Sequence, residues 1–290
     1  MMDYIMHILI IFNIYVMLVL STNVTIMSNL FTLCQAAFYG IGAYIGTFLL
    51  MNYNLPFVVI AFVVMVCAGL LSYIITFASV KLKGDYFVLA TLGFQMIVYT
   101  ILYNWMSVTR GPYGIAGIPG IKLFGVFQLS EIWHYFVFSS VLMVLMGILF
   151  AGLKRSPYGR ILRAIRSDEL SLSTLGRDVH FAKGSAFFIS ASFASLAGVL
   201  YASYTSYIDP TGFSLAESLF IISALFIGGI GNVKGSVLGA LFVVVFPEIL
   251  RLIGLPDAVQ SNLRQVIYGL TLVIIMFVRP QGILGQERLK

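Results

Sequence analysis

The residue types that most often carry catalysis are scattered along this chain and fit no reaction centre. The three histidines, His7, His134 and His180, are dispersed, and none has a partner at metal-ligand spacing. Cys34 and Cys67 fall inside apolar runs without a CxxC or Cys/His spacing, so the sequence predicts neither a disulfide nor a metal site. No order of Ser, His and Asp, or of Cys and His, fits a nucleophilic centre. We therefore expect that the chain is not an enzyme.

One segment, residues 154–183, concentrates the charge of the chain. It carries seven of the 17 Lys and Arg residues, namely Lys154, Arg155, Arg160, Arg163, Arg166, Arg177 and Lys183. Short loops rich in positive charge resist transfer across a membrane, so this pattern indicates a cytoplasmic face. Asp168, Glu169 and Asp178 lie among the basic residues, which favours a folded docking element over a tract that binds lipid.

Apart from that segment the chain is strongly apolar. Of its 290 residues 60% are hydrophobic and 10% are charged, and the mean hydropathy is +1.00. Such a chain has too little polar surface to cover a soluble globule, so it is predicted to be an integral protein of the lipid bilayer. The net charge of +6 does not indicate nucleic-acid binding, because the basic residues lie between apolar runs. The run 5–20 lacks the basic region and cleavage site of a signal peptide.

Continuous apolar runs long enough to cross about 30 Å of hydrocarbon predict transmembrane helices. Nine are found, at 5–21, 26–50, 57–80, 86–105, 132–152, 184–207, 214–231, 236–253 and 263–278. Their uninterrupted apolar character disfavours a β-barrel, whose strands alternate. We predict an all-α, polytopic integral membrane protein of eight or nine transmembrane helices, with residues 1–290 as a single domain. The lower number applies if the glycine-rich segment 228–235 is the tip of a re-entrant segment.

The charges of the loops predict how the chain is oriented. If residues 154–183 are cytoplasmic, Lys81, Lys83, Lys234 and the basic tail lie on the same side. Thirteen of the 17 basic residues are then cytoplasmic, against four outside, namely Arg110, Lys122, Arg251 and Arg264. This bias follows the positive-inside rule. The N-terminus is expected outside and the C-terminus in the cytoplasm, because an odd number of crossings separates them.

The segment 154–183 also carries a helix pattern. The motif SPYGR at 156–160 ends the preceding helix, and an apolar stripe at helical spacing follows at Ile161, Ile165, Leu172 and Leu175. Ser167 is expected to cap a short helix with Asp168 and Glu169 in its first turn, and Gly176 to end it. Such an amphipathic helix fits a groove on a partner protein. The alternative, a helix lying on the inner leaflet, is disfavoured because anionic lipid would repel the two carboxylates.

Small residues line one face of the second apolar run. Positions 36, 40, 43 and 46–47 favour close packing against another helix over a surface that lines a substrate path. Gly40-x-Gly42 is no nucleotide fingerprint, because no strand precedes it and the third glycine is missing. Gln35 and Tyr39 lie one turn apart and could offer polar groups to a path, although a single interhelical hydrogen bond is favoured. The candidates for pathway or packing roles are Gln35, Tyr39, Gly40, Gly42, Thr91 and Gly93.

The loop 109–120 holds four glycines and two prolines in twelve residues, which predicts tight turns instead of a helix. A docking or gating surface and a simple connector are equally compatible with this composition. Its candidate docking residues are Arg110, Gly111, Pro112, Tyr113 and Gly114.

Ionisable residues also lie close to the apolar runs. Glu248 and Arg251 share one helix face next to Pro247, near the outer end of their run, which favours a pair at the membrane interface over a functional site. Glu217 and Asp209 flank the preceding outer turn and are expected to face water.

A set of short motifs, taken together, resembles one family over most of the chain: the inner-membrane permease subunits of ABC importers for branched-chain amino acids, specifically those of the LivM type. The motifs are LKGDYF at 82–87, TLGF at 91–94, GPYG at 111–114, GIP at 117–119, SPYGR at 156–160, AIRSDE at 164–169, LG at 175–176, FISA at 188–191, AGVLYA at 197–202, GGIG at 228–231 and RPQGILG at 279–285.

The resemblance implies a coupling loop at 159–176 that sits in a cleft of a cytoplasmic ATPase. The implied contact residues are Gly159, Arg160, Arg163, Ala164, Ile165, Arg166, Asp168, Glu169, Leu172 and Gly176. The loop departs from the Glu-Ala-Ala-x-x-x-Gly form of other importer permeases, since Glu169 lies seven residues before Gly176 and Ser171 and Leu172 replace small residues.

The chain contains no G-x-x-x-x-G-K-[ST] phosphate loop, so ATP and Mg²⁺ are expected on separate ATPase subunits and no cofactor on this chain. The resemblance implies a bacterial or archaeal cytoplasmic membrane and three kinds of partner: a related permease, two ATPase subunits and an extracytoplasmic solute-binding protein. Urea or short amides are alternative substrates. A self-contained secondary transporter or channel is disfavoured, because we find no internal repeat and no acidic residue near mid-membrane.

Overall fold

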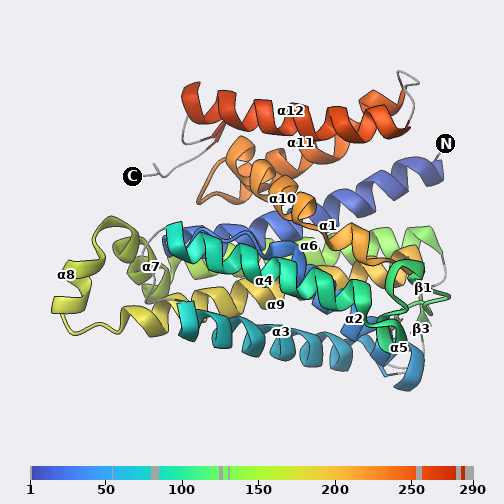
Figure 1. Cartoon of the computed structure of the whole chain (residues 1–290), viewed down its shortest axis with the longest axis horizontal. Coiled ribbons are helices and arrows are strands. Elements are labelled where there is room, and N and C mark those ends of the chain that lie inside the picture. The colour runs from blue at the N-terminus through green and yellow to red at the C-terminus, as the bar shows by residue number, and fades with distance from the viewer. Residues whose placement is uncertain are drawn as a thin grey trace.

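The computed structural model describes residues 2–53, 55–79, 85–123, 127–129, 131–252, 257–278 and 282–284. Long helices run along a common axis, and four two-residue strands form two small antiparallel sheets (Figure 1). The helices are α1 (Met2–Met27), α2 (Gln35–Tyr53), α3 (Phe57–Ser79), α4 (Asp85–Asn104), α5 (Met106–Thr109), α6 (Ile132–Arg155), α7 (Pro157–Ser167), α8 (Glu169–Thr174), α9 (Val179–Thr205), α10 (Leu215–Gly228), α11 (Val233–Leu252) and α12 (Asp257–Val278). The prediction of an all-α polytopic membrane protein is confirmed.

The shorter elements gather at the two ends of the bundle. Helices α7 and α8 lie at one end, called here the α8 end, at the left in Figure 1. At the other end, called here the strand end, lie the 3-10 turns η1 (Gly111–Tyr113) and η2 (Pro210–Phe213) and the strands β1 (Ile115–Ala116), β2 (Lys122–Leu123), β3 (Phe127–Gln128) and β4 (Tyr207–Ile208). The charged segment and the glycine-rich loop therefore lie at opposite ends.

Six helices of the described residues are long and apolar enough to cross a membrane, fewer than the nine predicted runs. They comprise Met2–Met27, Phe57–Thr76, Asp85–Asn104, Ile132–Arg155, Val179–Thr205 and Val233–Arg251. Helix α2 has 19 residues but lies outside this group, because Gln35, Asn52 and its glycines lower the hydropathy. Helices α10 and α12 also lie outside this group. Each of the nine predicted runs nevertheless overlaps a helix, although the runs did not show where the helices break.

One such break falls inside the predicted run 26–50. Helix α1 ends at Met27, where Asn29 adopts a left-handed φ of 59° and Leu30 N–H donates to Thr25 O at 3.1 Å. This arrangement ends a helix in the way a C-terminal glycine usually does. Residues 28–34 are not helical, and α2 begins only at Gln35.

A second break precedes α10. Phe213 in the 3-10 turn η2 is 1% exposed, so the chain already lies inside the bundle before α10 begins. At 1.5 Å per residue the 14 residues of α10 span roughly 21 Å, less than the hydrocarbon thickness. The predicted crossing 214–231 is therefore a short helix preceded by a buried turn.

Helix α10 turns back into α11 through a tight hairpin. A Cβ on Gly228 would lie 1.9 Å from Gly235 O, and one on Gly239 would lie 1.8 Å from Ala224 O, so the two backbones are in contact. Gly231 at the turn accepts a bond from Lys154 Nζ at 2.5 Å, which places the turn at the α8 end. The segment 228–235 is thus the turn of a helical hairpin at the α8 end.

The charged residues of the loops divide between the two ends of the bundle as the charge pattern predicts. Lys234 follows the hairpin turn at the α8 end, and Arg110 and Arg251 lie at the strand end. The described ends of the chain also separate, since Tyr4 bonds Glu248 at the strand end and Leu284 N–H donates to Gly228 O at the α8 end. Lys81, Lys83, Arg279, Arg288, Lys290 and the motif residues 82–84, 279–281 and 285 lie outside the described residues.

Candidate functional site

Helix α7 is fixed by packing. Ser156 caps it by accepting a bond from Gly159 N–H at 3.1 Å, and Pro157 occupies the first turn. A Cβ on Gly159 would lie 2.2 Å from Leu153 O, so only glycine allows this close approach to the end of α6. Leu162 and Ile165 are 0% and 1% exposed, facing the bundle. Arg163 Nη1 donates to Lys154 O at 2.7 Å and joins α7 to α6 once more.

Helix α8 is a separate, shorter element. Its N-cap is Asp168, whose carboxylate accepts a bond from Ser171 N–H at 3.1 Å. The prediction that Ser167 caps this helix is wrong: Ser167 is the last residue of α7, because the extended backbone at Asp168 breaks the chain into two helices. Gly176, predicted to end α8, has a φ of +76°, which favours glycine, one residue after the C-cap Leu175.

The apolar stripe predicted across this segment is divided by the same break. On α7, Ile165 faces the bundle, whereas Leu175 after α8 is 78% exposed. Leu170, which the stripe did not include, is also 78% exposed, and no residue of α8 is buried. Leu172 is half-buried against the core. The outer side of α8 therefore presents two large apolar side chains to solvent.

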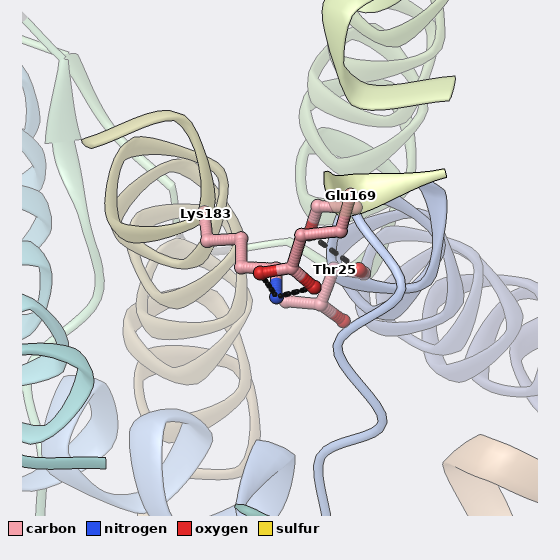
Figure 2. A network of polar contacts seen from close by, with 4 residues as sticks. Thr25, Glu169 and Lys183 are labelled. Carbon is pink, nitrogen blue, oxygen red and sulfur yellow. Dashed lines mark hydrogen bonds and ion pairs between the residues drawn. The ribbon is translucent and has the colours of Figure 1, made fainter. Parts of the chain in front are cut away.

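An ion pair ties α8 to α9. Lys183 Nζ lies 2.7 Å from both carboxylate oxygens of Glu169, and the two side chains point toward each other from different helices (Figure 2). Thr25 of α1 is drawn beside this pair (Figure 2). Lys183 was interpreted as a charge of the cytoplasmic loop, but it belongs to α9 and is only 6% exposed.

A hydroxyl ties α7 to the same part of α9. Tyr158 OH donates to Ala182 O at 3.0 Å and lies 2.6 Å from Ser185 Oγ. Burial raises the pKa of Tyr158 above its ordinary value of 10, so the phenol remains a donor at neutral pH. Helices α7 and α8 are thus both attached to the first two turns of α9.

The candidate coupling residues differ in their access to a partner. Arg160, Asp168 and Gly176 are exposed, whereas Gly159 and Ile165 are buried. Half-buried positions are Arg163, Ala164, Arg166, Glu169 and Leu172. The surface available to a partner is consequently smaller than the predicted set, and it includes Leu170 and Leu175.

A polar cluster surrounds the N-terminus of α2 deep in the bundle. Gln35 is fully buried, and its Nε2 donates to Ser21 Oγ of α1 and, at 3.2 Å, to Ser190 Oγ of α9. Its Oε1 has no hydrogen-bond partner among the described residues. The favoured reading of Gln35 as an interhelical contact fits this geometry, with bonds to two helices in place of one.

Gln95 on α4, which the sequence patterns did not single out, completes this cluster. Its Oε1 accepts from Ala37 N–H at 2.7 Å and from Ser218 Oγ at 3.2 Å, and its Nε2 donates to Phe213 O at 2.8 Å. One amide therefore joins α2, α4, α10 and η2. An amide inside an apolar run was the available signal, because such groups bond across helices in lipid.

The other pathway candidates lie in packing contacts. Thr91 Oγ1 accepts from Leu33 N–H at 3.1 Å, in the non-helical segment before α2. The Tyr39 ring lies 5.0 Å from that of Phe213, and a Cβ on Gly40 would lie 2.9 Å from the same ring. Gly42 contacts the α9 backbone, since a Cβ would lie 2.1 Å from Ser195 O. Gly93 has open space around it.

The loop 109–120 is built from turns, as its composition predicts. Arg110, Gly111 and Gly114 have φ of 57°, 53° and 68°, and η1 contains Pro112. Ile115 pairs with Ile208 in the β1–β4 ladder, which fixes the loop against the end of α9. Tyr113 is 81% exposed. The loop is therefore held by β1 in its middle, and the Tyr113 side chain next to this ladder is open to solvent.

The ionisable residues near the strand end contact α1. Tyr15 OH donates to Glu217, which is half-buried, so the expectation that Glu217 faces water is wrong; α10 begins inside the bundle and carries it there. Tyr4 OH donates to Glu248, and Arg251 Cζ lies 5.9 Å from the Tyr4 ring centroid. Glu248 and Arg251 thus share the predicted face, where both meet the N-terminal helix.

Comparison with known proteins decides the family. Residues 4–276 match the family described as branched-chain amino acid transport system / permease component. The chain belongs to this family. It is thus a permease component of a transport system that has other subunits, and a multi-pass membrane protein, as the motifs predicted.

Three curated relatives illustrate the similarity. The high-affinity branched-chain amino acid transport system permease protein LivM of Escherichia coli K12 is 33% identical over 95% of this chain and 68% of its own length. Its counterpart in Salmonella typhimurium LT2 is 34% identical over the same shares. A probable branched-chain amino acid transport permease protein LivH of Methanocaldococcus jannaschii is 24% identical over 95% of this chain and 90% of its own. No solved structure matches the chain.

Proposed function

We propose that this chain is the permease subunit of an ATP-driven importer for branched-chain amino acids and forms half of an alternating-access pathway. Family membership carries the proposal, because residues 4–276 match the permease family and the relatives named LivM are 33% and 34% identical. The chain is a bundle of long helices with short helices at one end, which suits a subunit whose rigid-body movement is driven by partner subunits.

The energy for transport comes from two cytoplasmic ATPase subunits that bind ATP and Mg²⁺. The absence of a phosphate-loop motif from the sequence supports this division of labour. Residues 159–176 contact the ATPases, with Leu170 and Leu175 as the apolar side chains that fill the ATPase cleft. Their 78% exposure, on α8 and at its C-cap, supports that role because it leaves both side chains accessible to a partner at the α8 end.

The second half of the pathway is a related permease. The similarity of this chain both to proteins named LivM and to one named LivH supports a pair of homologous subunits. A solute-binding protein docks at Arg110, Gly111, Pro112, Tyr113 and Gly114. The exposed Tyr113 on a loop held by the β1–β4 ladder supports this assignment.

The α8 end faces the cytoplasm and the strand end faces outward, in a bacterial or archaeal cytoplasmic membrane. The seven basic residues of segment 154–183 support this orientation through the positive-inside rule. The N-terminus is then outside and the C-terminus inside.

Uptake measurements test the proposed function. Deleting the gene should abolish uptake of labelled leucine, isoleucine and valine, and the gene supplied on a plasmid should restore it. Loss of labelled urea uptake instead would overturn the substrate assignment. Leucine uptake that survives depletion of ATP at an intact membrane potential would indicate a secondary transporter.

A further inference from the structure

Lys183 carries a charge where charge is unfavourable. It lies in the second turn of α9 and is 6% exposed. An ammonium group removed from water needs a close partner of opposite charge. Glu169 supplies it, since both of its carboxylate oxygens lie 2.7 Å from Nζ (Figure 2). The Glu169 carboxylate is consequently occupied inside the chain.

Helix α8 has little else to hold it in place. It has six residues, none of them buried, and a helix of this length is not stable alone in water. The chain breaks on either side of it: Asp168, between α7 and α8, has extended backbone, and Gly176 has a φ of +76°. Two side chains of α8 reach inward, Leu172 by packing against the core and Glu169 through the ion pair. The position of α8 therefore depends strongly on Lys183.

Lys183 stands at the start of a helix that leads to the interior cluster. Farther along α9, Ser190 accepts a bond from Gln35, the first residue of α2. A Cβ on Gly198 of α9 would lie 2.1 Å from Tyr39 O of α2, so the two helices touch backbone to backbone. Helices in such contact move together, because sliding would force atoms to overlap.

We infer that the Glu169–Lys183 pair is a positioning contact that passes movement of α8 to α9 and, through the backbone contact, to α2. Glu169 then acts on α9 and does not bind the ATPase surface, which is left to Leu170 and Leu175. This inference rests on the proposed coupling of residues 159–176 to ATPase subunits.

The test uses the complete complex in proteoliposomes, with its partner permease, both ATPases and the solute-binding protein loaded with labelled leucine. Leucine uptake and ATP hydrolysis are measured on the same samples, together with the yield and melting temperature of the complex and the amount of ATPase bound to it. The variants are Glu169→Gln, Lys183→Gln, Lys183→Met and the charge swap E169K/K183E. The matched control is Asp178→Asn, which removes a carboxylate from the same segment and retains a side chain that can cap α9.

Glu169→Gln and both Lys183 variants should lower leucine uptake per ATP hydrolysed by at least about fivefold, the lower end of usual coupling strengths. ATP hydrolysis should persist, and Asp178→Asn should behave as wild type. The charge swap should give more leucine uptake per ATP hydrolysed than any single variant at Glu169 or Lys183, since it restores opposite charges. Lys183→Met keeps the test valid if Lys183→Gln fails to assemble, because Met fills similar volume without an unmet hydrogen-bonding group.

Three results would overturn the inference. The first is an unchanged ratio of uptake to hydrolysis in Glu169→Gln and in the Lys183 variants. The second is a lower yield or melting temperature with an unchanged ratio, which would mean a merely structural pair. The third is a loss of ATPase binding in Glu169→Gln alone, which would place the carboxylate on the ATPase. A wild-type complex without ATP-dependent leucine uptake would instead contradict the proposed function itself.

Discussion

Helices α7 and α8 belong to one charged segment, yet they are held in opposite ways. Helix α7 buries Leu162 and Ile165 and touches the end of α6 through Gly159. Helix α8 buries no residue and is attached through Glu169 and the half-buried Leu172. The difference indicates that α7 is fixed and that α8 can move. Packed side chains resist displacement, whereas a small helix held by an ion pair can be displaced and can pass its movement to α9. The predictions below address each side of this comparison.

Gly159→Val should give the largest effect. The new Cβ would lie 2.2 Å from Leu153 O and 2.7 Å from Lys154 O, both backbone atoms that cannot move aside cheaply. We expect loss of folded protein, measured as the monodisperse fraction in detergent. The matched control is Gly152→Ala on α6, where a Cβ meets nothing within 4 Å. Normal yield of Gly159→Val would show that α7 is not packed against α6 as described.

Leu162→Ala should destabilise the protein by about 2–5 kcal/mol, because the side chain is fully buried and its removal leaves a cavity. The matched variant Leu170→Ala should change the free energy of unfolding by less than about 0.5 kcal/mol, because its side chain is exposed. Thermal unfolding in detergent measures both. Equal destabilisation by the two variants would remove the distinction between α7 and α8.

Leu170→Ala should nevertheless weaken binding of the ATPase subunits. Leu162→Ala should lower ATPase binding only in proportion to its loss of folded protein. Binding of purified ATPase to the detergent-solubilised permease pair measures this. Unchanged affinity in Leu170→Ala and in Leu175→Ala would exclude these side chains from the ATPase contact.

Asp168→Ala should destabilise α8 by about 1 kcal/mol, less than Leu162→Ala destabilises the protein, because it removes the N-cap of α8. Asp168→Asn should be close to wild type, since an amide oxygen can accept the same bond from Ser171 N–H. Circular dichroism is too coarse for six residues, so amide hydrogen exchange at 169–174 is the measurement. If amide exchange in Asp168→Asn is as fast as in Asp168→Ala, the charge of Asp168 and not its capping bond stabilises α8.

The short motifs indicated the family, and hydropathy and charge were sufficient to predict the class of protein, because both depend on composition over many residues. They failed where a single residue changes the local structure. The left-handed backbone at Asn29 and the extended backbone at Asp168 break helices that periodicity joined. The burial of Phe213 before α10 follows from tertiary packing, which no run of apolar residues reveals.

The polar contacts inside the bundle were harder to predict than the packing. Lys183 was counted with the loop because its charge suits a cytoplasmic face, but its partner Glu169 lies 14 residues away in sequence and lets it be buried. Gln95 was visible as an amide in an apolar run, yet its partners Ala37, Ser218 and Phe213 come from distant elements. Polar residues that pair across different helices have no regular spacing in the sequence.

Thiol labelling tests the central claim most directly, namely that α8 is exposed to the cytoplasm and covered there by a partner. A Leu170→Cys variant, with Cys34 and Cys67 replaced by alanine, is treated with a membrane-impermeant maleimide. We predict labelling in inside-out vesicles stripped of ATPase, protection when the ATPase subunits are added back, and no labelling of intact cells. Labelling of intact cells, or inside-out vesicles in which the ATPases give no protection, would contradict the account.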